Sequence, residues 1–98
     1  MEVEYKNASI RKVCQNADEA EKKYGVRMAE LIHQRIDEIR AMSTVEDLIK
    51  YRIGRCHALK GNRKTQYAMD LVHPQRLIFE KKETTIQIVR IIEIADYH

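Results

Sequence analysis

The sequence predicts an α+β fold, in which an N-terminal strand and a helical hairpin pack on a C-terminal antiparallel sheet. Helical periodicity is concentrated in the first half of the chain, and short strand patterns separated by turn residues fill the second half. The strongest strand signal lies in residues 83–98, where isoleucine and valine dominate positions 86–94 without glycine or proline. Because this segment is apolar on both faces, we expect a central strand that is covered on both sides.

The first half predicts one strand followed by a helix with recognisable ends. Residues 2–13 form the expected first strand, with a break near Asn7. A helix then begins at Asn16, because the Asn16 side chain can accept a hydrogen bond from the Glu19 amide and Glu19 can reach back to it. Gly25 ends this helix, since glycine readily adopts the left-handed conformation of a C-cap.

A second helix, residues 26–42, has one apolar stripe and an opposite polar side, so it is expected to pack on a sheet. Ser43 to Glu46 can form another capping box, which starts a short helix through Ile49. Three short strands then follow at the spacing of tight turns, in residues 55–60, 67–72 and 77–80, with a break at His73-Pro74. They predict an antiparallel meander that leads into the last strand.

Length and composition predict one soluble domain spanning residues 1–98. No apolar run approaches the roughly 20 residues that cross a bilayer, and the chain does not open with a basic and then apolar leader. We therefore expect a cytoplasmic protein without membrane association. In that reducing compartment Cys14 and Cys56 are expected to remain free thiols.

Charge is distributed unevenly along the chain. Residues 1–49 hold 8 basic and 10 acidic side chains, whereas residues 50–98 hold 10 basic and 5 acidic ones. Residues 50–64 contain six basic side chains and no acidic one. Such a cluster fits a polyanionic partner, because phosphate groups respond to local rather than net charge. A solvated basic loop is the alternative interpretation.

The second half also holds the residue types that can cleave RNA through its own 2′-hydroxyl group. That reaction needs a base for the hydroxyl, an acid for the leaving oxygen and cations for the developing charge on the phosphate. These roles can be filled without a metal ion. The candidates are His57, Lys60, Arg76, Asp96, Tyr97 and His98, with Arg55, Arg63 and Lys64 as supporting charge.

Strand alternation does not by itself bring these candidates together. In the last strand it places Ile86, Ile88, Ile92 and Ile94 on one face, and Val89 and Ile91 on the other. It puts Asp96 and His98 on one face of the strand and Tyr97 on the other, and it also places His57 and Lys60 on different faces. A structural role for His57, a turn-capping role for Arg76 and a frayed polar terminus therefore stay open as alternatives. A zinc site from the histidines is not expected, because no pair has the close spacing of zinc motifs.

Four segments of the second half occur in the order of a known family. They are Gly54–Arg63 (GRCHALKGNR), Tyr67–Leu71 (YAMDL), Pro74–Phe79 (PQRLIF) and Ile91–His98 (IIEIADYH). Together they resemble HigB-type toxins of the RelE/ParE superfamily of bacterial toxin–antitoxin systems. The resemblance implies a RelE-like, microbial-ribonuclease-like sheet with helices on one side, in agreement with the order of elements above. Over residues 1–53 it extends only to the general pattern of a strand and a helical hairpin.

The resemblance also implies a function, an mRNA interferase that cleaves translated mRNA in the ribosomal A site and inhibits translation. It implies no metal ion or other cofactor and a 2′,3′-cyclic phosphate product. The resemblance assigns His57 and Lys60 to the active site, where Lys60 would bind the phosphate, and it assigns Arg76 to stabilising the transition state. Acid–base or orienting roles fall to Asp96, Tyr97 and His98. RNA binding falls to Arg55, Arg63 and Lys64.

The implied partners are the ribosome with its mRNA and a cognate HigA-like antitoxin with a helix-turn-helix domain, through which the complex would bind operator DNA. Two other functions remain open. ParE-type relatives keep the fold but poison DNA gyrase by binding it, so the fold alone does not decide between them. A small RNA-binding module without catalysis is the third hypothesis.

Overall fold

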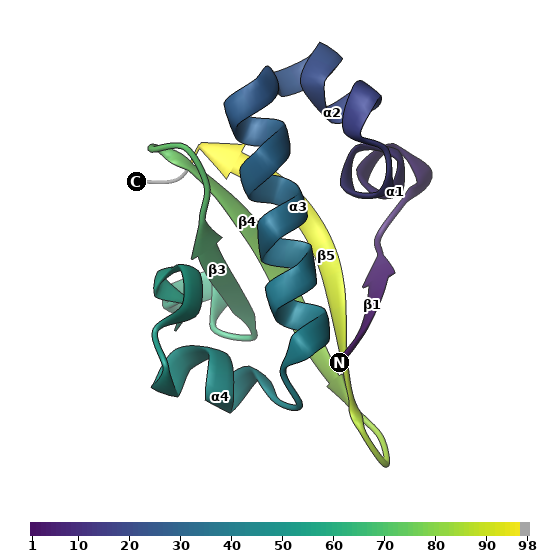
Figure 1. Cartoon of the computed structure of the whole chain (residues 1–98). Coiled ribbons are helices and arrows are strands. Elements are labelled where there is room, and N and C mark those ends of the chain that lie inside the picture. The colour runs from purple at the N-terminus through teal and green to yellow at the C-terminus, as the bar shows by residue number, and fades with distance from the viewer. Residues whose placement is uncertain (97–98) are drawn as a thin grey trace.

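Five strands form one mixed sheet in the order β1-β5-β4-β3-β2 in the computed structural model, which describes residues 1–96 (Figure 1). The strands are β1 (Glu2–Tyr5), β2 (His57–Ala58), β3 (Gln66–Asp70), β4 (Gln75–Glu83) and β5 (Gln87–Asp96). Strands β2 to β5 pair antiparallel, as the sequence predicts, and β1 pairs parallel with β5. Strand β5 is interior, between β1 and β4, but β4 occupies the centre of the sheet.

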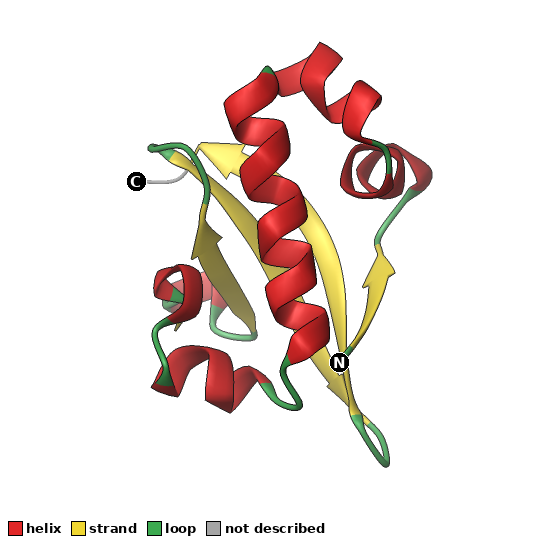
Figure 2. Ribbon diagram, in the orientation of Figure 1, coloured by secondary structure: helices red, strands yellow, loops and turns green. Residues whose placement is uncertain are grey.

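The helices precede most of the sheet in the chain, and α3 runs across one face of it (Figure 2). They are α1 (Ala8–Gln15), α2 (Ala17–Tyr24), α3 (Val26–Ala41) and α4 (Val45–Lys50), followed by the single 3-10 turns η1 (Ile53–Arg55) and η2 (Gly61–Arg63). The apolar stripe of α3 buries Ile32 and Ile39 completely, in one cluster with Phe79 and Ile91 of the sheet. The predicted α+β class, with a helical layer on a C-terminal sheet, is confirmed.

The first predicted strand is too long, because residues 8–13 are helical. Strand β1 ends at Tyr5, and the Asn7 side chain accepts a hydrogen bond from the Ile10 amide at 2.9 Å, which caps α1. Helix α1 then buries Val13 and Cys14 against the core. The pattern of Asn7 followed by apolar Ile10 is compatible with the start of a helix as well as with a strand. The helix forms because it buries one of its faces against the core.

The other helix ends agree closely with the sequence. Asn16 accepts hydrogen bonds from the Asp18 and Glu19 amides, at 3.0 and 3.2 Å, and Gly25 closes α2 with a φ of 87°. The short helix α4 begins one residue later than predicted, because Thr44 rather than the preceding serine caps it through the Asp47 amide at 3.1 Å.

A β-bulge in β5 changes which residues share a face of the sheet. Ile78 pairs with Glu93 but the next residue, Phe79, pairs with Ile91, so Ile92 has no residue opposite it. Ile94 therefore joins the face that packs on the helices, and Ile92 packs on the outer face. The predicted alternation, which grouped these two isoleucines, is wrong beyond the bulge.

Charged residues connect α4 to the hairpin between β4 and β5. Lys81 forms ion pairs with Glu46 and Glu83, and Gln87 donates to Glu46 at 2.7 Å while accepting from the Val45 amide at 2.9 Å. The hydrogen bonds from Lys81 and Gln87 lower the pKa of Glu46 below its ordinary value of 4.5, and those to Glu46 and Glu83 raise the pKa of Lys81. Both charged forms therefore stabilise the folded state near neutral pH.

We expect Glu46→Gln to lower the free energy of unfolding by about 0.5 kcal/mol at pH 7, because the ion pair is exposed to solvent. Since the pKa of Glu46 is lowered by folding, its contribution is present above pH 4.5 and is lost as the pH falls through the folded-state value. Urea unfolding at pH 7 and at about pH 3 measures this difference. Equal losses at both pH values would contradict the role of the Glu46 charge.

No helix within residues 1–96 combines the length and the apolar character needed to cross a bilayer.

Candidate functional site

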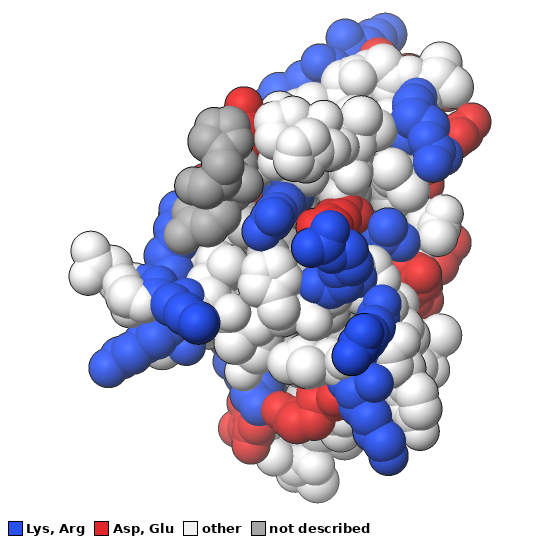
Figure 3. Space-filling view, turned by 90° about the vertical axis from the view of Figure 1, so that its left-hand side faces the viewer, with Lys and Arg blue, Asp and Glu red and all other residues white. Residues whose placement is uncertain are grey.

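A cleft of about 620 Å³ opens where the α4–β2 connection meets the edge of the sheet. Its lining residues are Ile49, Arg52, Arg55, Cys56, His57 and Arg76. Half of these side chains are arginine and none is acidic, so the cleft attracts anions. Lys and Arg side chains gather around a smaller area of acidic atoms on this side of the molecule (Figure 3).

The register of the sheet brings His57 and Arg76 together. His57 pairs with Ala68, Ala68 pairs with Ile78, and Arg76 lies two residues before Ile78 on the same face, away from α3. The Arg76 Nη1 atom lies 3.4 Å from His57 Nε2. Two candidates that are 19 residues apart in sequence therefore share one site.

Hydrogen bonding selects the tautomer of His57. Its Nδ1 atom lies 2.9 Å from the carbonyl oxygen of Arg55, which can only accept, so Nδ1 carries the hydrogen and donates it. The Nε2 atom of the neutral ring then carries a lone pair, and it faces the guanidinium group of Arg76. A lone pair held beside a fixed cation in an anion-attracting cleft can act as a general base on a phosphate-bearing substrate.

Asp70 completes this group, although it is not among the candidates that the sequence patterns indicate. Its carboxylate lies 3.5 Å from Arg76 Nε and 3.4 Å from Arg55 Nε. Asp70 is the residue opposite Arg76 in the β3–β4 hairpin. The sequence feature that could have indicated this contact is the turn at His73-Pro74, because it sets the pairing of the two strands. The carboxylate orients the guanidinium groups of Arg55 and Arg76. Because these side chains are already ordered, they lose less conformational entropy when an anion binds.

Arg35 connects helix α3 to the site through a hydrogen bond to the main chain of Asp70. The Arg35 Nε atom donates to the carbonyl oxygen of Asp70 at 2.7 Å, and Nη1 donates to Glu38 at 2.8 Å. Gly54 lets this side chain pass, because a Cβ atom there would lie 2.7 Å from Arg35 Nε, and its φ of 57° also favours glycine. Arg35 thereby ties the end of β3 to α3 and packs closely against the turn η1.

Cys56 contributes an apolar wall to the cleft. Burial raises the pKa of the Cys56 thiol to about 12, so the thiol is neutral at physiological pH. Because the thiolate is the nucleophilic form, Cys56 is inert as a nucleophile. Cys14 is a buried free thiol of the same kind.

The remaining candidates lie outside the cleft lining. Lys60 and Lys64 are exposed at the two ends of η2, and Arg63 within that turn forms an ion pair with Glu93. Asp96 ends β5 opposite Gln75, whereas Ala95 is opposite Arg76, so the register starts the Asp96 side chain on the face away from Arg76. Tyr97 and His98 lie outside the described residues.

The structure thus brings together three predicted residues, Arg55, His57 and Arg76, and adds Arg52 and Asp70. Arg52 belongs to the basic run of the sequence, but only the turn that follows α4 directs it to the cleft. Within residues 1–96 no group of three or more His, Cys, Asp or Glu side chains is placed to hold a metal ion together.

The sheet, its helical layer and the order of elements define the fold of YoeB/RelE-like toxins. Several solved structures share it, and two of them illustrate the likeness. One is a YoeB/ParE toxin from Agrobacterium tumefaciens, with a TM-score of 0.70 and 15% sequence identity over 100% of both chains. The other is a YoeB dimer from Staphylococcus aureus, with a TM-score of 0.65 and 16% identity over 100% of this chain and 97% of that one. At such low identity the likeness shows the fold.

No model of a known protein family matches the chain. A search of curated proteins likewise finds no match.

Proposed function

We propose that this protein is the toxin of a bacterial type II toxin–antitoxin system and that it cleaves translated mRNA in the ribosomal A site. The observation that carries this proposal is the lone pair of His57 Nε2 beside Arg76 in an arginine-lined cleft. The shared fold supports the toxin class, and the terminal motifs support the HigB type within it.

In the proposed reaction, His57 Nε2 takes the proton from a ribose 2′-hydroxyl group. The 2′-oxygen then forms a bond to the adjacent phosphorus, and the bond from phosphorus to the 5′-oxygen of the next nucleotide breaks. Arg76 compensates the negative charge that develops on the phosphate oxygens, and Arg55 is proposed to bind the RNA beside it. The products are a 2′,3′-cyclic phosphate and a 5′-hydroxyl group, which must receive a proton as it leaves.

The source of that proton is assigned by the resemblance to HigB-type toxins. Asp96, Tyr97 and His98 are proposed to supply the acid or to orient it, and Lys60 to bind the phosphate. Arg63 and Lys64 are proposed to bind RNA beside the cleft. We also propose a cytoplasmic location and a HigA-like antitoxin partner, through whose helix-turn-helix domain the complex binds operator DNA.

A second candidate is a ParE-type toxin that binds DNA gyrase without cleaving RNA. The observation that favours it is the fold shared with the YoeB/ParE toxin of Agrobacterium tumefaciens. In that case the toxicity would depend on surface contacts, and His57 and Arg76 would have no chemical role.

Induction of the chain in bacteria, with mapping of the 5′ ends of cellular mRNA, separates the two candidates. The matched variant lacks Tyr97 and His98. Codon-phased cuts in the parent that vanish in the truncated chain, with its folding retained, are the expected result. Growth arrest with intact mRNA, unchanged by the truncation, would overturn the nuclease and favour the gyrase-binding toxin.

We expect Asp70→Asn to reduce RNA cleavage about tenfold, which is the effect of removing one charge-assisted contact to an active-site arginine. The amide keeps the shape of the side chain, so the melting temperature should change little. Asp37→Asn, the same change at an exposed carboxylate of α3 that does not line the cleft, is the matched control and should leave cleavage unchanged. Equal rates for Asp70→Asn and the parent would show that Asp70 does not position Arg76.

A further inference from the structure

The turn between α4 and β2 holds two arginines in the left-handed region of backbone conformation. Arg52 has a φ of 55° and Arg55 a φ of 54°, close to the 57° of Gly54 between them. Residues with a side chain pay for this conformation in folding free energy, whereas glycine does not. Arg52 also stands directly after the C-cap of α4, where glycine or asparagine is the usual choice.

The hydrogen bonds of the turn do not require arginine at either position. They join main-chain atoms, from Arg52 N to Ile49 O at 3.1 Å, from Arg55 N to Arg52 O at 3.2 Å and from Cys56 N to Ile53 O at 3.0 Å. Glycine at positions 52 and 55 would make the same bonds with less strain. The reason for arginine therefore lies in the side chains, and strained residues of this kind are typical of functional sites.

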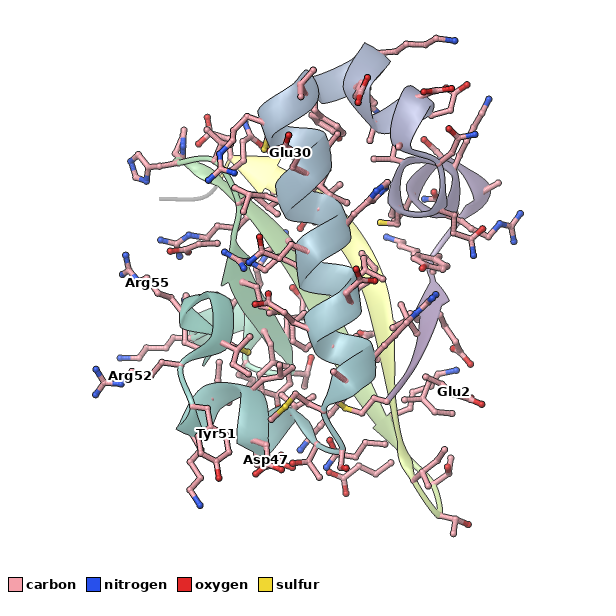
Figure 4. The ribbon with its side chains drawn as sticks, in the orientation of Figure 1. Glu2, Glu30, Asp47, Tyr51, Arg52 and Arg55 are labelled. Atoms are coloured by element: carbon pink, nitrogen blue, oxygen red, sulfur yellow. The ribbon has the colours of Figure 1, made fainter. Side chains whose placement is uncertain are left out.

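Both side chains lie at the cleft that contains His57 and Arg76. The Arg55 side chain is 80% exposed while its Nε atom contacts Asp70, so its guanidinium group remains open to solvent. Next to Arg52, Tyr51 is 61% exposed, so its side chain is available for contact with a ligand. Figure 4 shows Arg52 and Arg55 projecting to the left from one edge of the molecule, with Tyr51 projecting downward from the adjoining end of α4.

Tyr51 has a basic residue on each side of it in the chain. The Lys50 Nζ atom lies 5.3 Å from the centroid of the Tyr51 ring, and Arg52 follows in the chain. Asp47 lies one turn earlier, in α4 (Figure 4). An exposed aromatic ring next to basic residues is a combination that binds unpaired nucleotides, because the base stacks on the ring while the cations hold the phosphates.

We propose that Tyr51, Arg52 and Arg55 form a subsite for single-stranded RNA, which binds a nucleotide next to the phosphate held at His57 and Arg76. The base stacks on Tyr51, and Arg52 and Arg55 bind the flanking phosphate. This inference rests on the proposed function and extends it to the substrate. A single strand is required, because in a duplex the faces of the bases are already stacked.

The test uses the full chain and a fluorescein-labelled, single-stranded hexanucleotide with 2′-O-methyl groups, which cannot be cleaved through its 2′ oxygen. Fluorescence anisotropy measures Kd at several salt concentrations. We expect Tyr51→Ala to raise Kd about tenfold, the effect of losing one base–aromatic stack, and Tyr51→Phe to keep it within about twofold of the parent.

Arg52→Gly should weaken binding and stabilise the fold at the same time. Losing one phosphate contact lowers the steepness of log Kd against log salt by about 0.7, while relief of the left-handed strain raises Tm by about 4 °C. A purely structural arginine would instead lower Tm when replaced. Arg52→Gln and Arg27→Gln form a matched pair with the same change of charge, and only the first should weaken binding, because Arg27 lies on α3 beside Glu30.

An unchanged Kd for Tyr51→Ala, or equal losses for Arg52→Gln and Arg27→Gln, would overturn the subsite. So would a Tyr51→Ala chain that loses binding to a protein partner but keeps the Kd of the parent for RNA. Failure of the proposed function has a different signature, in which the parent binds the methylated RNA as expected but leaves unmodified mRNA on the ribosome uncut.

Discussion

Replacing Arg76 with alanine should reduce RNA cleavage by about two orders of magnitude, which is the usual loss when one donor to a developing oxyanion is removed. The guanidinium group is held between His57 Nε2 at 3.4 Å and the Asp70 carboxylate at 3.5 Å, so it is ordered before substrate binds. A preorganised cation costs little reorganisation in the transition state. Single-turnover cleavage of mRNA on programmed ribosomes measures the effect.

Arg90→Ala is the matched control for that measurement. Arg90 is also a strand arginine paired with a carboxylate, with Nη1 3.5 Å from Glu80, but it is not among the residues that line the cleft. Its removal should leave the rate unchanged. Arg76→Lys should recover only part of the activity, because an ammonium group keeps the charge but loses the planar fork that binds two phosphate oxygens. Cleavage by Arg76→Ala within twofold of the parent would remove Arg76 from the mechanism.

Replacing Phe79 with alanine should lower the free energy of unfolding by about 4 kcal/mol, which is among the largest effects of a single core substitution. Phe79 lies in the central strand β4 and is fully buried under the helices. Its ring stacks on that of Tyr67 in β3, with centroids 5.5 Å apart. The substitution removes this contact and leaves a cavity that the surrounding strands can fill only in part.

Urea unfolding followed by circular dichroism measures this loss. Ile86→Ala is the control, because Ile86 is 56% exposed in the turn between β4 and β5, and its truncation should cost less than about 0.5 kcal/mol. A loss below about 1 kcal/mol for Phe79→Ala would contradict its place in a close-packed core.

The elements that the sequence predicted best depend on contacts within a few residues. The cap at Asn16 and the apolar stripe of α3 follow from residues two to four positions apart, and the helix end at Gly25 follows from the positive φ that glycine tolerates. Residues 8–13 were assigned wrongly because their few apolar positions suit either period, and only packing of the Val13 face on the core separates the two.

The bulge at Ile92 shows the limit of strand alternation. The isoleucine-rich pattern predicted a strand, and β5 is one. Its two faces exchange at the bulge, however, because one extra residue shifts every later side chain to the opposite side. Nothing within β5 itself marks this position, since the bulge is a property of its pairing with β4.

Some residues of the candidate site could be named from the sequence, and others only from the structure. The sequence named Arg55, His57 and Arg76, through their chemistry and their resemblance to family motifs. It did not select Asp70, which meets Arg76 only through the register of the β3–β4 hairpin. Nor did it select Tyr51 or Arg52, whose exposure and backbone conformation become visible only in the folded turn. The structure places the described candidates, but the chemical and RNA-binding roles assigned to all of the candidate residues remain predictions.

The sequence by itself determined the α+β class, most helix ends and several of the residue types that line the arginine-rich cleft. These properties follow from local capping, periodicity and side-chain chemistry. Only the tertiary structure decided which side chains meet. His57 and Arg76 are 19 residues apart, and their contact depends on hydrogen-bond registers across three strands and on the turn at Gly54, against which Arg35 packs. Long-range pairing of this kind is set by the packing of the whole chain, so short sequence patterns do not encode it.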